Sequence, residues 1–214
     1  MMRFLAAFLM LAGSAFGQTN VGSPFISGTV RYTKAMSPIS FGLIRIASGH
    51  LIIDPGVEMI ATSSNSQFQL INGSSSTLSI LGDESNPVTI RSGGAYSWRG
   101  ITNTIRSTRP RIEIANAMLL GLGSQSKAIE LFDADFLFTN SVFQGSRLTS
   151  TGTTTTGFIN SRNSGAFVNC LIDGFTNGAV ITKGVVLQDT DIRNTVTPIT
   201  TPQNANVTIS LVVE

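Results

Sequence analysis

The sequence predicts an all-β solenoid, a fold in which short parallel strands stack coil upon coil. One phrase occurs four times in its second half: alternating apolar residues, an Asn or Asp, two apolar residues and then a turn residue. Alternation with period two is typical of strands and not of helices. The central positions of the four copies, Asn116, Asn140, Asn169 and Asp189, are 24, 29 and 20 residues apart. This is the range expected when one repeat forms one solenoid coil.

The four copies also predict how the coils hold together. A single coil cannot bury its apolar face, so each copy must stack on its neighbours. An Asn at the same point of successive coils can hydrogen-bond the turn backbone and the Asn of the next coil. We therefore interpret the four Asn or Asp positions as structural.

From residue 41 onward, the first half of the chain also consists of short expected strands between turn residues. These strands cover residues 43–46, 51–53, 57–60, 68–71, 78–81 and 88–90. Turn pairs such as Pro55-Gly56 and Asn86-Pro87 end them, and no segment has the apolar spacing of an amphipathic helix. At about 22 to 24 residues per coil, the chain accommodates roughly seven or eight coils.

Residues 1–17 have the layout of a secretory signal peptide, with a basic residue, an apolar run over 4–11 and a small-residue ending. A membrane anchor is the alternative, but the run is shorter than the ~20 residues that span a bilayer. We expect a secreted protein, extracellular, on the cell surface or periplasmic, with no transmembrane segment in the mature chain. The expected divisions after the signal peptide are an N-terminal cap or lead-in over 18–40 and a solenoid domain over 41–214.

The charge of the chain argues against a nucleic-acid-binding protein, and its cysteine content argues against a fold held together by disulfides. The chain has 14 Lys and Arg against 12 Asp and Glu, a formal net charge of +2, which is not the signature of a nucleic-acid-binding protein. Cys170 is the only cysteine, so no intrachain disulfide can form. Because the other copies have a small residue at this position, we expect Cys170 to be a buried filler and not a reactive thiol.

Three stretches resemble successive elements of one known family. They are Leu51-Ile-Ile-Asp-Pro-Gly-Val57, Gly82-Asp-Glu-Ser-Asn-Pro-Val-Thr-Ile90 and Ser97-Trp-Arg-Gly-Ile101. They are similar to elements of secreted bacterial proteins of the pectate-lyase-like superfamily, and the Asn-centred copies resemble the same class. The resemblance covers about residues 41–200 and implies a single-stranded right-handed parallel β-helix of the non-catalytic surface type. The implied handedness agrees with the general rule for parallel crossovers.

An arginine cluster with a tryptophan provides the candidate ligand-binding site: Arg91, Trp98, Arg99 and Arg106. Guanidinium groups bind the carboxylates of acidic sugars, and an aromatic face can pack on a sugar ring. The alternative is a solvated face of the coil, with Trp98 packed at a coil corner.

Two further columns of charge are expected across neighbouring coils. Alignment on the Asn positions places Arg111 over Asp135, and Arg109 in line with Asp133 and Arg162. Opposite charges on adjacent strands stabilise the register of a sheet, so we interpret these columns as structural.

Asp173, Asp189 and Asp191 are the weak candidates for catalysis, because β-helix hydrolases use one protonated carboxyl group and one carboxylate across a water. The resemblance would imply an Asn-Thr-Asp, an Asp-Asp, a Gly-His-Gly and an Arg-x-Lys element for such an enzyme. Only Asp189-Thr-Asp191 partly matches the first, and the sole histidine, His50, lies several coils away. A lyase would instead need clustered Asp residues around calcium, and no metal site is expected here.

These observations favour a secreted or cell-surface module with a structural, adhesive or glycan-contacting role, without catalysis and without a cofactor. The expected partners are an acidic polysaccharide or a surface protein, together with end-to-end self-association through an expected final strand over 207–213. The alternative is a polysaccharide lyase or glycoside hydrolase of the pectin-degrading kind, which a convergent carboxylate cluster in a groove would reveal. A further interpretation is that the chain is a fragment of a longer protein.

Overall fold

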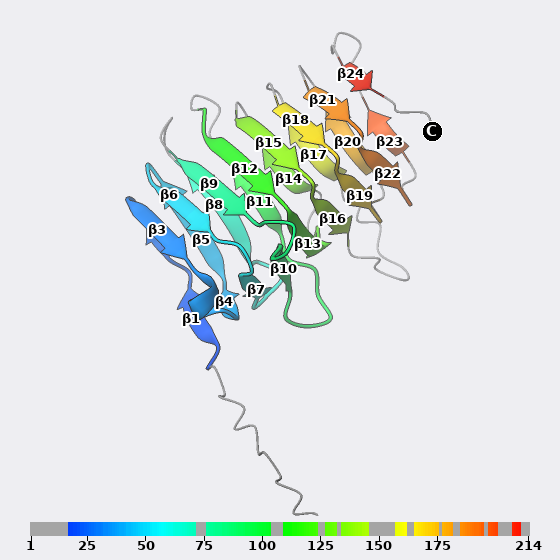
Figure 1. Ribbon diagram of the computed structural model, residues 1–214. Coiled ribbons are helices and arrows are strands. Elements are labelled where there is room, and N and C mark those ends of the chain that lie inside the picture. The colour runs from blue at the N-terminus through cyan, green and yellow to red at the C-terminus, as the bar shows by residue number, and fades with distance from the viewer. Residues whose placement is uncertain are drawn as a thin grey trace, which may run out of the picture.

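The computed structural model describes residues 17–71, 76–103, 109–123, 127–131, 134–145, 157–161, 165–175, 177–181, 185–194, 197–200 and 207–210. Within these ranges strands are the main secondary structure, and the one helical element is a short 3-10 turn, η1 (Lys34–Met36). Figure 1 shows the strands stacked side by side in an elongated array.

The strands form three parallel sheets around one core. Sheet A contains β1 (Thr19–Gly22), β4 (Ile39–Phe41), β7 (Glu58–Ala61), β10 (Val88–Ser92), β13 (Ala117–Leu122), β16 (Val142–Gly145), β19 (Leu171–Asp173) and β22 (Asp191–Arg193). Sheet B contains β2 (Phe25–Ile26), β5 (Leu43–Ala47), β8 (Gln67–Ile71), β11 (Gly100–Asn103), β14 (Lys127–Leu131), β17 (Gly157–Ser161), β20 (Asn177–Ile181) and β23 (Thr197–Thr200). Sheet C contains β3 (Thr29–Tyr32), β6 (His50–Ile53), β9 (Thr77–Leu81), β12 (Arg111–Ala115), β15 (Asp135–Thr139), β18 (Gly165–Val168), β21 (Val185–Gln188) and β24 (Val207–Ser210).

Each strand pairs with the strand three further along the chain, which is the topology of a parallel β-helix. The chain passes from sheet A to sheet B to sheet C and then returns to sheet A in the next coil. The predicted all-β parallel solenoid is confirmed.

The three sheets begin before residue 41. β1, β2 and β3 pair in parallel with β4, β5 and β6, so residues 19–32 belong to the same three sheets. The alternation here is too short to be recognised, since β2 has two residues and Phe25 on it is 62% exposed. The predicted signal peptide lies outside the described residues, apart from its last residue.

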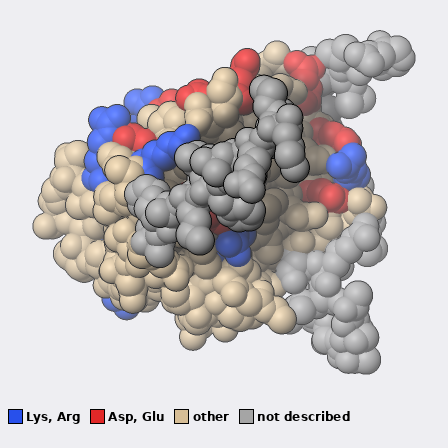
Figure 2. All heavy atoms as spheres, turned by 60° about the horizontal axis from the view of Figure 1, so that its bottom comes forward, with Lys and Arg blue, Asp and Glu red and all other residues tan. Residues whose placement is uncertain are grey.

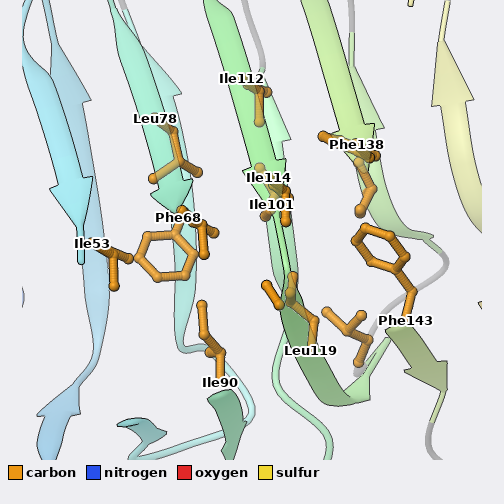
Figure 3. Close-up of a cluster of buried hydrophobic side chains, with 14 of the residues drawn as sticks. Ile53, Phe68, Leu78, Ile90, Ile101, Ile112, Ile114, Leu119, Phe138 and Phe143 are labelled. Carbon is orange, nitrogen blue, oxygen red and sulfur yellow. The ribbon is translucent and has the colours of Figure 1, made fainter. Parts of the chain in front are cut away.

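The core consists of apolar rows that run along the solenoid. In sheet C, Ile53, Ile80, Ile114, Phe138 and Phe167 occupy one register position in successive strands, and each is fully buried. Figure 3 shows Ile53, Ile114 and Phe138 of this row pointing into the space between the sheets, together with residues from sheets A and B. Burying each such side chain contributes about 1.5 to 3 kcal/mol, so the stacking of coils is the main source of stability.

Sheets C and A meet at a sharp corner, here called the Asn corner and formed by Asn116, Asn140, Asn169 and Asp189. All four have left-handed backbones, with φ of 47°, 48°, 53° and 48°, a conformation that Asn and Asp tolerate better than most residues. The Asn169 amide donates to Asn140 Oδ1 at 2.9 Å, and the Asn116 amide donates to the Gly82 carbonyl at 3.1 Å. One is a bond between Asn side chains of successive coils and the other is a bond to the turn backbone, and the sequence predicted both kinds.

Cys170 follows the corner and is a buried filler, as predicted. Its thiol is 3% exposed and lies 3.4 Å from the Phe138 carbonyl oxygen. Burial raises the pKa of the Cys170 thiol to about 11. One coil earlier, Ser141 donates to the Thr139 carbonyl at 2.7 Å. The small side chains of Ser141 and Cys170 therefore donate to backbone carbonyl groups from inside the solenoid.

Candidate functional site

The predicted site of arginines around a tryptophan is not assembled at the surface. Trp98 is fully buried, and its indole N–H donates to the Leu120 carbonyl at 2.9 Å. Its ring makes edge contacts with Phe41 and Phe68, at centroid distances of 5.9 and 6.0 Å. The indole belongs to the core, so its face is not presented to a sugar.

The two described arginines of that cluster have different contacts. Arg91 on β10 is paired with Glu58 on β7, with 2.7 Å between Nε and Oε1. The half-buried Arg99 is held through its backbone N–H, which donates to the Ser66 carbonyl at 2.9 Å. Arg106 lies outside the described residues. This geometry agrees with the alternative interpretation, in which Trp98 is packed at a coil corner and Arg91 lies on a solvated face.

One predicted charge column is present. Arg111 on β12 and Asp135 on β15 are register partners, and Arg111 Nη2 also lies 3.6 Å from Glu113 Oε2 on its own strand. The second column stays a prediction, because Asp133 and Arg162 are outside the described part of the chain.

Two of the three carboxylate candidates meet in a shallow groove along the Asn corner, which we call the corner groove. Its volume is about 350 Å³. The lining residues are Asn140, Ser141, Val142, Asn169, Cys170, Leu171, Asp189, Asp191 and Arg193. They come from three successive coils, because the corner recurs once per coil. The groove therefore combines amides, carboxylates, one guanidinium group and two apolar side chains.

The third candidate, Asp173, does not line the groove. It is the register partner of Arg193 on the neighbouring strand and accepts a hydrogen bond from the Asn194 amide. The structure thus brings Asp189 and Asp191 together and places Asp173 beside them on sheet A.

The groove offers solvent-exposed hydrogen-bonding groups to a ligand. The Asp191 side chain is 63% exposed, and its Oδ2 lies 3.9 Å from Arg193 Nη1. Asp189 is exposed as well. Exposed carboxylates and amides can exchange water for the hydroxyl groups of a polar ligand. In the part of the chain that the structure describes, no three His, Cys, Asp or Glu residues are grouped so that they could hold a metal ion.

Sequence reasoning assigned Asn140 and Asn169 to structure alone and did not consider Arg193. The available signal was the corner itself, because residues at equivalent positions of successive coils must line one edge of the solenoid. Figure 2 shows acidic and basic side chains interspersed, with wide uncharged areas, on the face in view. No single-sign patch dominates that face.

Comparison of the chain with protein-family models, with curated proteins and with solved structures finds no match. Within the described residues, no helix is both long and apolar enough to cross a membrane.

Proposed function

We propose that this chain is a secreted or cell-surface β-helix module that contacts glycans without cleaving them. The corner groove is the observation that supports the proposal. Sugars present hydroxyl groups beside C–H faces, and binding sites for them need polar groups that orient the ligand next to apolar contacts. In the groove, the amides of Asn140 and Asn169 lie beside Val142 and Leu171, and this combination suits a sugar.

The charge of the groove favours neutral or amine-bearing glycans. Asp189 and Asp191 provide two carboxylates against the single guanidinium group of Arg193. An acidic polysaccharide, the partner expected from the arginine cluster, would meet like charge here. We therefore place the contact at the Asn corner and not at Arg91, Trp98 and Arg99.

The remaining parts of the proposal rest on the sequence. The signal-peptide layout of residues 1–17 supports secretion. The resemblance of the chain to the pectate-lyase-like superfamily, together with the parallel topology, supports membership in its non-catalytic surface type and right-handed coiling.

The test is a glycan array of neutral, amine-bearing and acidic polysaccharides, probed with the mature protein and with an Asp189→Asn/Asp191→Asn variant. Asn is the residue found at the other corner positions, so Asp189→Asn keeps the corner backbone, and Asp191 is an exposed residue of β22. The Asn amide keeps only a neutral acceptor, and hydrogen bonds to charged acceptors are about twice as strong as those to neutral ones, so over two positions we expect binding to weaken by about tenfold. Glu84→Gln, which removes one charge from an exposed turn residue, is the matched control and should bind like wild type.

The bound polysaccharides are then followed for hours for new reducing or unsaturated ends. Binding without product, weakened in the groove variant alone, supports the proposal. Product formation would instead favour the alternative, a polysaccharide lyase or glycoside hydrolase. No binding to any class would overturn the proposal and favour a structural or protein-binding rod.

A further inference from the structure

The outer face of sheet C has two unlike halves. Figure 1 shows its eight strands side by side. One outward-facing column begins with Arg31, Ile52, Ser79 and Glu113 on β3, β6, β9 and β12, and it continues with Leu137, Ala166 and Val186 on β15, β18 and β21. Charged and polar side chains thus predominate in the first half, and apolar ones follow in the second.

The apolar half is open to solvent. Leu137 and Val186 are 41% and 37% exposed, although both are large apolar residues. Beside Leu137 is a hollow of about 270 Å³ with Arg111 and Asp135 at its edge. An exposed apolar stripe next to a hollow and a pair of opposite charges is typical of an interaction surface.

We propose that two copies of the chain pack face to face through sheet C, about a two-fold axis parallel to the strands and midway between β12 and β15. This rotation exchanges β12 with β15 and leaves positions along the strands unchanged. Because Arg111 and Asp135 are register partners, each Arg111 then faces the Asp135 of the other copy. The face is complementary to itself, as a closed dimer requires.

Over the rest of the sheet, the same axis places the first half of one copy opposite the second half of the other. It passes through the middle of the eight strands, so β6 lies opposite β21 and β9 opposite β18. Ile52 of one copy then faces Val186 of the other. Leu81 faces Val168 in the same way, since these residues share a second register column. At both positions an outward-facing apolar side chain therefore meets an apolar partner.

In the column that runs from Arg31 to Val186, a charged residue lies opposite an apolar one only at the centre, on β12 and β15. Leu137 faces Glu113 of the other copy, but the Glu113 carboxylate lies 3.6 Å from Arg111 on its own strand. Its methylene stem is then left for contact with Leu137, and Arg111 is shared between Glu113 and the Asp135 of the second copy.

The size of the face predicts a weak dimer. Eight strands about 4.8 Å apart and five residues of about 3.3 Å each give roughly 600 Å² per copy. Stable interfaces bury about 800 Å² per partner. We therefore expect a dissociation constant of about micromolar or higher.

Sedimentation velocity from about 1 to about 300 μM, a range that brackets such an affinity, tests the proposal. We expect a reversible monomer–dimer equilibrium. Arg111→Asp and Asp135→Arg should each raise the dissociation constant by about tenfold or more, because each places like charges opposite one another. The double variant Arg111→Asp/Asp135→Arg should restore dimerisation. The Arg111 side chain is 70% exposed and Asp135 is exposed, so these variants should fold normally.

Two controls place a new charge elsewhere. Gln144→Arg and Gln144→Asp alter an exposed residue of sheet A and should leave the equilibrium unchanged. Leu137→Glu, which places a second carboxylate opposite Glu113 of the other copy, should abolish the dimer. A monomer at all concentrations, a double variant as weak as the singles, or species that grow beyond the dimer would overturn the proposal. Species larger than the dimer would support end-to-end association. The sedimentation results do not depend on glycan binding, so they test this proposal separately from the proposed function.

Discussion

Gly165 on β18 leaves room for the ring of Phe136 on the neighbouring strand. A Cβ added at Gly165 would lie 2.2 Å from Phe136 Cε1, 2.3 Å from Cζ and 2.4 Å from Cδ1. All three atoms belong to one rigid ring, and ordinary contact begins near 3.4 Å. The Gly165→Ala variant therefore requires the ring to move by about 1 Å or more.

The ring has little freedom to move. Its centroid is 4.9 Å from that of Phe138 and 5.4 Å from that of Phe167, and both neighbours are fully buried. Overpacking of this kind costs about 1 to 3 kcal/mol, and in a chain of this size 1 kcal/mol lowers Tm by about 2 to 4 °C. We expect Gly165→Ala to lower Tm by about 2 to 12 °C in thermal unfolding followed by circular dichroism.

The control for this prediction is Gly28→Ala. A Cβ at Gly28 meets nothing within 4 Å, so Tm should change little. In a Phe136→Leu background, the smaller side chain should reduce the cost of Gly165→Ala, which is a coupling that a double-mutant cycle measures. The reasoning would be refuted if Gly165→Ala were as harmless as Gly28→Ala, or if its cost were the same in both backgrounds.

Two further predictions follow from buried side chains. Because the pKa of the Cys170 thiol is raised from 9.0 to about 11 in the folded state, its contribution to stability is complete below pH 9.0 and disappears as the pH rises through about 11. Denaturant unfolding of wild type and Cys170→Ala should show this extra alkaline loss in wild type alone, and equal pH dependence would contradict it. Trp98, the only tryptophan, should give blue-shifted fluorescence that glycans do not quench and that shifts to the red on unfolding. Quenching by an acidic polysaccharide would instead restore the arginine–tryptophan site.

The repeated corner was predictable because its chemistry is local. A left-handed turn favours Asn, and the flanking alternation identifies the strands, so the positions of Asn116, Asn140 and Asn169 were recognisable from spacing alone. The same alignment predicted the register of Arg111 with Asp135 and the buried Cys170. These features depend on residues that recur once per coil.

Trp98 could not be placed in the same way. Its burial is determined by Phe41 and Phe68, which belong to earlier coils, while its immediate neighbours Ser97 and Arg99 are polar. The corner groove was missed for a related reason. Its lining comes from three coils, and whether Asp189 and Asp191 face the same hollow as Asn140 depends on how the corner turns.

At the Asn corner, the register between successive coils stays the same whatever the number of residues in each coil. The backbone N–H of Asn116, Asn140 and Asn169 donates to the residue just before the next corner, at 3.1, 3.0 and 2.9 Å. These bonds are alike although the successive coils have 24, 29 and 20 residues. Three residues separate the sheet B strand from the sheet C strand in each of these coils, so the additional residues are accommodated between sheets A and B, without displacing the strands that follow. The solenoid can accept longer or shorter surface loops there while its sheets stay aligned, which makes it a natural scaffold for loop exchange.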